Sequence, residues 1–423
     1  MPQIQTRDDL LFALTLAAEL EHSLSCQYLY AAYALKKRPD AGLTDAQAAA
    51  VQGWATTLAE IARQEMEHLG LANNLLTAIG GAPHFRRPNF PQPPGAYGIA
   101  LAAELEPLSL AALDRFIEYE RPDAPPAPEA DDGVPVDLGY TSIHDLYNQI
   151  AEAFARMDEA ALFIGPPAAQ VDNDVMHQER VGDRRVYGVQ LFAVTDRASA
   201  LRAVEQIIEE GEGAPEGGPD GEPEMTESHY ARLLRMRDGY REMVGADPAF
   251  APSHPVVRNP TTREHHRAAG PATRLTHPQA HAVAEVFGTA YEALLVALSR
   301  FYTRTDETDA EMYGLQRTAF FPLMVMALRP LAEMLAEMPA FEGGGPERAG
   351  APFEIYRSVR FLPQKAAAWT VLHERLWETA HAATALVGAP DVPPRMAFVA
   401  QNLERIAANF ADFMALPRHV VRP

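Results

Sequence analysis

The sequence is poor in cysteine and in positive charge, and these two shortages limit the cellular location and the classes of binding partner that we expect. Cys26 is its single cysteine, so no disulfide can form within the chain, and we expect a reducing, cytoplasmic location. The chain has 57 acidic residues against 36 basic ones, a formal net charge of −21. Such acidity disfavours nucleic acid and anionic membrane surfaces as partners, and it favours solubility.

Targeting signals and long uncharged hydrophobic runs are also missing. The N-terminus lacks the basic stretch of a signal peptide, and the first apolar run carries Glu19 and Glu21. We therefore expect neither a secretory leader nor a membrane span. Hydrophobic residues make up 47% of the 423 residues, which is enough to bury a full core.

Helical patterns dominate the rest of the sequence. Caps and apolar periodicity predict a first helix from Thr6 or Asp8 to about 37, and a second from Thr44 to about 79 that ends at Gly80-Gly81. Further patterns predict a short helix at 109–119, an amphipathic helix at 141–158, long helices at 197–210 and 224–244, and C-terminal helices at 280–304, 309–338, 361–387 and 394–415.

Glu65 and His68 stand out on the second predicted helix. They are three residues apart, so they share one helix face. Leu58, Ala62 and Ala72 continue that face, which predicts that it points into a core. A carboxylate and an imidazole buried there cost several kcal/mol unless a partner satisfies them. Glu-x-x-His inside a helix bundle is a known way to hold two iron or manganese ions.

A ferritin-like dimetal bundle also needs a Glu on its first helix, a Glu on its third and a Glu-x-x-His on its fourth. Glu21 lies in the middle of the buried stripe of the first predicted helix. His229 lies on the fourth, but Thr226 stands where the carboxylate is expected. The end of the third helix offers Glu209 and Glu212, three residues apart.

Together these positions provide four carboxylates and two imidazoles, the ligand inventory of a dinuclear site, namely Glu21, Glu65, His68, Glu209, Glu212 and His229. We also expect Glu21 and Glu65 to be the catalytic residues, with the substrate held beside them. If the third and fourth helices run antiparallel through a short loop, Glu209 lies level with His229, and Glu212 lies just beyond it.

Alternatives remain open for the second half of this set. Glu209 and Glu212 can be polar residues at a helix end, and His229 can be a satisfied core histidine. Glu205 is a rival for either glutamate because it lies close to the stripe of Val204 and Ile208.

Two other Glu-x-x-His spacings occur, with different expectations. In Glu19-x-x-His22 we expect the histidine either to support the metal ligands from behind or to pack in the core. In Glu378-x-x-His381 we expect both side chains to be exposed. Seven ring-bearing residues are candidates to line a substrate cavity, although most such stripes are plain core: Tyr28, Tyr30, Tyr33, Trp54, His144, Tyr147 and His177.

Several stretches in combination resemble one known family. They are residues 20–33, 65–76, 80–83, 163–167, 208–213 and 228–230. They resemble the ferritin-like family named for the iminophenyl-pyruvate dimer synthases of violacein and related indolocarbazole pathways, over roughly residues 10–240. The helical segments after Ala280 resemble the C-terminal part of stand-alone members. The resemblance implies the fold, a metal site and oxidative tailoring of a small aromatic or amino-acid-derived metabolite, but no particular substrate.

The expected fold class is all-α. We predict a ferritin-like four-helix bundle over residues 1–245 with a long irregular insertion at 82–195. A linker at 246–279 and a C-terminal helical bundle at 280–423 follow.

The expected function is that of a non-haem diiron oxidase or oxygenase, because carboxylates and neutral imidazoles suit iron. Two Fe ions are the expected cofactor, with Mn as the alternative, and O₂ is the expected co-substrate. The expected partner is a small-molecule substrate, and a homodimer is the candidate assembly. Two other classes remain: an iron-storage protein without an organic substrate, and a metal-free scaffold in which the same residues form salt bridges.

Overall fold

The regular structure of the protein is almost entirely helical, as the sequence predicts. The computed structural model describes residues 4–39, 42–122, 140–173, 180–181, 184–185, 190–212, 227–266, 268–357, 359–360 and 363–414. Within these ranges the strands are two residues long and form two small pairs. The all-α class is therefore confirmed.

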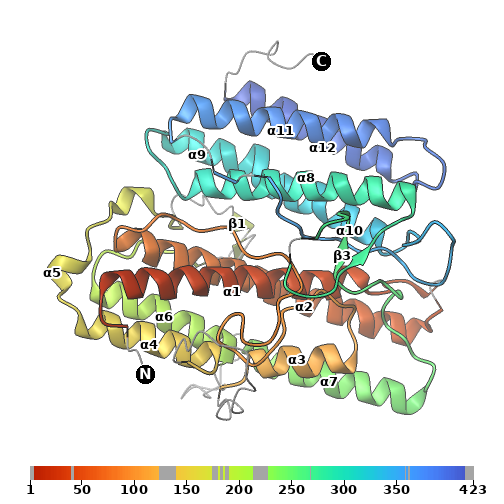
Figure 1. Ribbon diagram of the computed structural model, residues 1–423, viewed down its shortest axis with the longest axis horizontal. Coiled ribbons are helices and arrows are strands. Elements are labelled where there is room, and N and C mark those ends of the chain that lie inside the picture. The colour runs from red at the N-terminus through yellow and green to blue at the C-terminus, as the bar shows by residue number, and fades with distance from the viewer. Residues whose placement is uncertain are drawn as a thin grey trace.

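Two long helices, α1 (Arg7–Ala34) and α2 (Asp45–Ala78), lie side by side in the middle of the molecule (Figure 1). Both begin in a capping box, in which Thr6 or Thr44 caps the helix and the residue three positions later bonds back to the cap. Gly80 follows α2 with a φ of 88°, a left-handed conformation that glycine adopts at low cost. The predicted starts of both helices and the end of α2 are thus confirmed, whereas α1 ends at Ala34, three residues before the predicted end.

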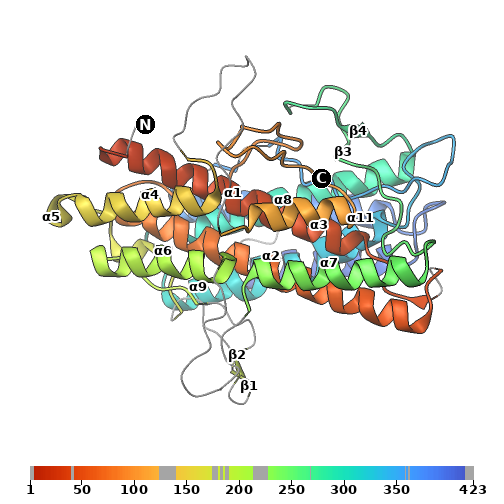
Figure 2. The same ribbon diagram turned by 90° about the horizontal axis from the view of Figure 1, so that it is seen from below.

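Four shorter helices complete the bundle as two broken rods. Figure 2 shows α4 (Ile143–Arg156) and α3 (Leu110–Tyr119) along one line, and α6 (Arg197–Glu212) and α7 (His229–Ala246) along the next. α4 packs on α6, and α3 packs on α7. The stretch predicted as an insertion therefore contributes two helices to the bundle.

This arrangement corrects one prediction. α6 and α7 were expected to run antiparallel as separate bundle helices, but α7 continues along the line of α6 (Figure 2). α7 also begins at His229, capped by Ser228, so the histidine is the first residue of its helix. Glu209 and His229 therefore do not lie level with each other on two antiparallel helices.

The C-terminal half stacks on the other side of α1 and α2 (Figure 1). Its elements match the four predicted helical patterns. They are α8 (Pro278–Phe301), α9 (Asp309–Leu315), η3 (Gln316–Phe320), η4 (Leu323–Leu328), α10 (Arg329–Leu335), α11 (Lys365–Ala385) and α12 (Met396–Phe413). The π-helical segments η3 and η4 lie between α9 and α10 and divide the second predicted pattern.

The remaining elements are short. They are α5 (Glu159–Leu162), a 3₁₀ turn η2 (Pro167–Ala169), the antiparallel pair β1 (Arg180–Val181) and β2 (Arg184–Arg185), and the parallel pair β3 (Pro260–Thr261) and β4 (Thr273–Arg274). In the first pair Arg180 opposes Arg185, and in the second Pro260 opposes Thr273.

The segment predicted as a linker, 246–279, runs along the end of α1. The backbone N–H of Lys36 donates to Pro252, and that of His254 donates to Ala34, both at 2.8 Å. Lys37 also forms a 2.6 Å ion pair with Glu333 at the end of α10. The N-terminal and C-terminal halves are thus joined at the end of α1 by backbone hydrogen bonds and by charge.

Two helical stretches, 278–301 and 309–335, are long and apolar enough to cross a bilayer by composition alone. In the folded protein 67% and 50% of their apolar windows are buried against other helices. A helix that is apolar on most sides is expected in a protein core. Their packing therefore accounts for their composition.

The loop after α5 makes a close contact that yields a stability prediction. The N–H of Gly165 donates to Ala78, and a Cβ at Gly165 would lie 1.7 Å from the carbonyl oxygen of Thr77. Gly165→Ala should lower the free energy of unfolding by about 1–3 kcal/mol or more, because backbone must move. Gly53→Ala is the matched control, since a Cβ there meets nothing within 4 Å. It should stabilise α2 by about 0.5–1 kcal/mol. Urea unfolding of both variants checks this, and equal effects would contradict it.

Candidate metal centre

Glu65 is the centre of a buried cluster of carboxylates and imidazoles. Its two oxygens face different histidines: Oε1 lies 2.9 Å from Nδ1 of His229, and Oε2 lies 3.7 Å from Nδ1 of His68. Two groups with metal-binding potential share this residue, Glu21–Glu65–His68 and Glu65–Glu120–His229, each with ligand atoms within 4.8 Å of one another. All five residues are buried. The cluster therefore consists of two adjacent groups that could each hold a cation and that share Glu65.

The helices bring these side chains together in two different ways. Glu21 and Glu65 project from the middle of α1 and α2, which cross the whole bundle. Glu120 and His229 lie instead at helix ends, where the two rods are broken: Glu120 is the C-terminal cap of α3, and His229 opens α7. The breaks thus place two polar side chains beside the long helices.

Tyrosines hold two of the carboxylates in place. Tyr147 of α4 donates a 2.5 Å hydrogen bond to Oε1 of Glu21. Tyr28 of α1 donates to Oε1 of Glu120. Because each phenol occupies one oxygen, the other oxygen of each carboxylate remains directed at an imidazole, 3.6 Å from His68 and 3.5 Å from His229.

Glu210 contacts the ring nitrogen of His68 that faces away from Glu21 and Glu65. Its Oε2 lies 3.2 Å from Nε2 of His68, while Nδ1 of the same ring faces Glu21 and Glu65. Gln64 and Gln206 donate to the Glu210 carboxylate at 3.3 and 3.1 Å. A carboxylate that accepts from the far nitrogen of a histidine fixes the tautomer and the ring orientation, as occurs behind metal-bound imidazoles. Glu210 is therefore placed to orient His68.

Burial and mutual charge set the proton affinities in the cluster. Burial raises the pKa of Glu21 to about 8. Burial would also raise the pKa of Glu65, but His229 and His68 outweigh it and hold that pKa below its ordinary value. Burial would lower the pKa of both imidazoles, yet the surrounding carboxylates raise it for His68 and for His229. In the absence of a cation, the raised pKa values of Glu21, His68 and His229 favour protonation of these groups, which reduces the repulsion among the carboxylates.

The orphaned atoms of His229 test whether a metal suits this cluster. Among the described residues, neither ring nitrogen of His229 has a hydrogen-bond partner, and neither does Oε1 of Glu65, although Nδ1 and Oε1 lie 2.9 Å apart. A buried polar atom left unpaired costs about 1–3 kcal/mol. A cation bound by Glu65, Glu120 and His229 would satisfy Oε1 of Glu65 and one ring nitrogen of His229. Carboxylate oxygens with imidazole nitrogens are a donor set that iron and manganese accept.

The predicted site residues divide into two groups. Glu21, Glu65, His68 and His229 come together. Glu209 does not: its side chain is exposed on α6, and Glu210 turns inward instead. The buried stripe of α6 explains the difference, because Ile207 and Glu210 are three residues apart on one face.

The other third-helix candidates fare differently. Glu205 is also exposed, so it does not replace Glu209. Glu212 is the last residue of α6, and its side chain lies outside the described residues. The sequence analysis missed Glu120 altogether. A signal for it existed, since Glu120 follows Leu113 and Phe116 on the buried stripe of α3.

The remaining Glu-x-x-His pairs behave as predicted. His22 hydrogen-bonds to Tyr291 away from the cluster, and Glu378 and His381 are exposed. Of the ring-bearing residues, Tyr28 and Tyr147 reach the cluster and Tyr33 lines a separate cavity. Tyr30 bonds to the Val257 carbonyl, Trp54 packs on Tyr240, His144 is half-buried near the start of α4, and His177 lies outside the described residues.

Comparison with known proteins agrees with this fold. The ferritin-like family model matches residues 14–238. Dichlorochromopyrrolate synthase of Lentzea aerocolonigenes is 28% identical over 96% of this chain and 41% of its own length. The 2-imino-3-(indol-3-yl)propanoate dimerase of Chromobacterium violaceum is 29% identical over 83% of this chain and 34% of its own. The chain thus spans well under half the length of these curated relatives.

A solved ferritin-like protein from Caulobacter vibrioides superposes with a TM-score of 0.47 at 18% identity, over 82% of this chain and 100% of that one. The two curated relatives confirm the resemblance found in the sequence. The family match covers more than half of the chain, which therefore belongs to the ferritin-like family.

Proposed function

We propose that the chain is a non-haem diiron oxidase or oxygenase that uses O₂ to modify a small aromatic or amino-acid-derived metabolite in a biosynthetic pathway. The observation that carries the proposal is the pair of buried ligand groups that share Glu65. The names of the two relatives support the substrate class, since one names dichlorochromopyrrolate as the product of a synthase and the other names an indole-bearing propanoate that is dimerised.

The proposal assigns the first ion to Glu21, Glu65 and His68, and the second to Glu65, Glu120 and His229. Two ferrous ions held this way would supply the electrons that reduce O₂. Manganese is the alternative metal. Glu209 is dropped from the predicted ligand set because it is exposed.

The chain's own residues would orient the metal ligands and keep bulk water away from them. Tyr147 and Tyr28 fix the outer oxygens of Glu21 and Glu120, and Glu210 fixes the ring of His68. The space beside the cluster is only ≈ 20 Å³. A water occupies about 10–15 Å³ by the same kind of measure, so bulk water is excluded while a water or a diatomic molecule fits.

A small-molecule substrate is the partner that the proposal needs. The proposal includes neither a nucleic acid nor a membrane, because the net charge of −21 opposes both. We further propose a cytoplasmic location, which suits ferrous iron and the single buried cysteine. A homodimer remains the predicted assembly.

Anaerobic Fe(II) loading followed by O₂ exposure tests the proposed function directly. We expect about two irons per chain, consumption of O₂ and a new visible absorption band, because two adjacent sites share one carboxylate. Uptake far above two irons per chain would indicate storage instead. Failure to bind iron or manganese, with the fold intact by circular dichroism, would leave a metal-free scaffold and overturn the proposal.

Variants of the ligands should separate the two sites by stoichiometry. Glu65→Ala should lose both ions, because both groups use Glu65, whereas Glu120→Ala should retain about one. Glu118→Ala is the matched control on the same helix, since its side chain is 39% exposed and lies outside the cluster. Metal analysis of dialysed protein gives the counts. Two ions retained by Glu120→Ala would show that the second site is misassigned.

The neighbouring glutamates of α6 offer a sharper comparison. Glu210→Ala should weaken metal binding about 10–100-fold, because His68 loses the carboxylate that orients it. Glu209→Ala should leave the affinity unchanged, since that side chain faces solvent. Competition with a fluorescent chelator measures the metal affinity of Glu210→Ala and of Glu209→Ala. Equal affinities of the two variants would contradict the role given to Glu210.

Metal affinity should rise with pH up to and through about 8. In the absence of metal, burial raises the pKa of Glu21 to about 8, and the carboxylates raise that of His68, so a cation must displace protons from both. Raising the pH removes those protons and strengthens binding; lowering it has the opposite effect. Mn(II) titrations in buffers of different ionisation enthalpy count the protons released. Binding without proton release would be the contrary result.

A further inference from the structure

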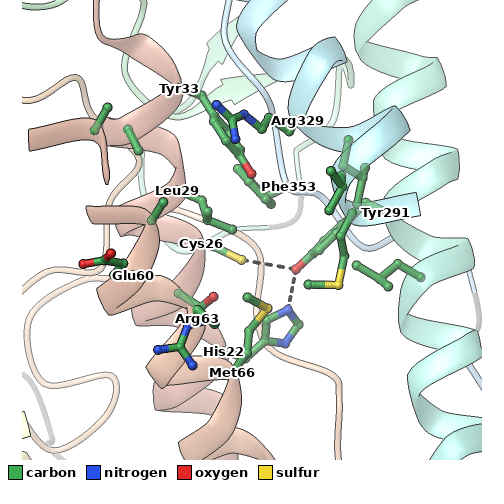
Figure 3. Close-up of a pocket in the computed structure, with 18 of the residues that line it drawn as sticks. His22, Cys26, Leu29, Tyr33, Glu60, Arg63, Met66, Tyr291, Arg329 and Phe353 are labelled. Carbon is green, nitrogen blue, oxygen red and sulfur yellow. Dashed lines mark hydrogen bonds between the residues drawn. The ribbon is translucent and has the colours of Figure 1, made fainter. Parts of the chain in front are cut away.

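A large cavity lies between α1–α2 and the C-terminal helices (Figure 3). It measures ≈ 590 Å³, whereas the space beside the Glu/His cluster measures ≈ 20 Å³. The two spaces share no lining residue. On α1, Glu21 borders the small space and the next residue, His22, borders the large cavity; on α2, Glu65 and Met66 divide in the same way. Successive helical residues point about 100° apart. The large cavity is therefore a site of its own, separated from the cluster by α1 and α2.

The large cavity is elongated along the two long helices. Its lining residues on α2 extend from Gln52 to Leu69, a length of about 25 Å at 1.5 Å per residue. They recur at the three- and four-residue spacing of one helix face: Gln52, Ala55, Thr56, Ala59, Glu60, Arg63, Met66 and Leu69. On α1 the lining extends from His22 to Tyr33. Because ≈ 590 Å³ is distributed over this length, the cavity is longer than it is wide and suits an extended molecule better than a compact one.

Aliphatic side chains form much of the cavity wall. Five leucines and two flexible methionines contribute: Leu29, Leu69, Leu294, Leu295, Leu298, Met66 and Met324. Methionine side chains adapt their shape to irregular apolar surfaces. Among the lining residues, Ala59 of α2 and Val325 of η4 are exposed, so the cavity opens to solvent between these two helices. A row of methylene groups would be removed from water against such walls, which is favourable.

The charges around the cavity balance one another. Its charged lining residues are Lys37, Glu60, Arg63 and Arg329. Lys37 and Arg329 lie 2.6 and 3.1 Å from Glu333, and Arg63 lies 3.8 Å from Glu67. These two carboxylates and that of the lining glutamate match the three cations. A charged group entering the cavity would have to displace one of these partners or remain unpaired, and either outcome costs free energy. The cavity therefore favours an uncharged ligand.

The two ends of the cavity differ in the hydrogen bonds that they offer. At one end the Tyr291 hydroxyl bonds to His22, accepts from Arg87 at 3.2 Å and lies 3.3 Å from the Cys26 sulfur (Figure 3). That hydroxyl is already satisfied, so an apolar group can lie against it. Tyr33 lies at the other end (Figure 3), and its hydroxyl forms no hydrogen bond with the described residues. It is free to bond to a polar group of a ligand.

We propose that this cavity binds a single alkyl or acyl chain with an uncharged polar head, the tail toward Tyr291 and the head beside Tyr33. The length of the cavity favours a chain, the aliphatic walls favour methylene groups, and the balanced charges favour a neutral head. An extended chain advances about 1.3 Å per bond, given a C–C bond of about 1.5 Å, so ten carbons lie well within the cavity. This binding does not rest on the proposed diiron function, because the cavity contains none of the proposed metal ligands.

Calorimetry on the metal-free full chain tests the proposal with 1-decanol as the probe. Affinity should rise about fourfold per methylene from 1-hexanol through 1-octanol to 1-decanol, the equivalent of about 0.8 kcal/mol for each buried CH₂. Decanoate has a charged head and 1-adamantanemethanol a compact body, and each should bind at least about tenfold more weakly than 1-decanol.

Three results would overturn the proposal: no binding of 1-decanol, an affinity that does not rise with chain length, or binding of decanoate or 1-adamantanemethanol as tight as that of 1-decanol. A protein that binds 1-decanol but no metal would end the proposed diiron function and leave this site standing.

Variants locate the binding. Ala59 is an exposed residue of α2 near the middle of the lined stretch, and Ala49 is an exposed residue of the same helix outside the cavity. Ala59→Phe should obstruct the cavity at mid-length and weaken 1-decanol about tenfold, with a smaller effect on 1-hexanol, whereas Ala49→Phe should change neither. Tyr33→Phe should weaken 1-decanol about fivefold, the loss expected for one hydrogen bond. If Ala59→Phe keeps a native circular dichroism spectrum and binds 1-decanol like the parent, the probe binds elsewhere and the proposal fails.

Discussion

The burial of three carboxylates and two imidazoles around Glu65 is the constraint on which the rest of the structure depends. Charged groups in a low-dielectric interior are tolerated only when each finds a partner of opposite charge, a proton or a cation. The protein supplies two tyrosines and Glu210 as fixed partners, and it still leaves His229 and one oxygen of Glu65 without hydrogen bonds among the described residues. Nδ1 of His229 still lies 2.9 Å from Glu65 and 3.5 Å from Glu120, so Nε2 is the ring nitrogen that the described residues leave without any partner.

The broken rods of the bundle follow from the same constraint. An unbroken helix presents only its side chains to the core, at fixed steps of about 100°. Where α3 and α6 end and α7 begins, the chain can direct Glu120, Glu210 and His229 toward α1 and α2 from helix ends. The breaks therefore provide positions that a regular third and fourth helix lack, while α1 and α2 remain continuous and capped.

α1 and α2 also separate two chemically different spaces. On one side lies a small cluster of carboxylates and imidazoles, and on the other lies a large cavity with mostly apolar walls. Tyr291 and Leu294 of α8 line this cavity together with residues of α1 and α2, so the cavity exists only because the C-terminal half packs against the long helices. This packing gives the C-terminal helices a role beyond covering the bundle.

The sequence by itself determined the all-α class, the starts of α1 and α2, and the placing of Glu21, Glu65 and His68 on buried helix faces, because each of these depends on local caps or on helical periodicity. Only the tertiary structure decided which glutamate of α6 turns inward, that Glu120 joins the cluster and that a separate cavity holds room for a ligand. These depend on how α6 and α7 align end to end and on how distant segments pack, and local periodicity carries no information about either.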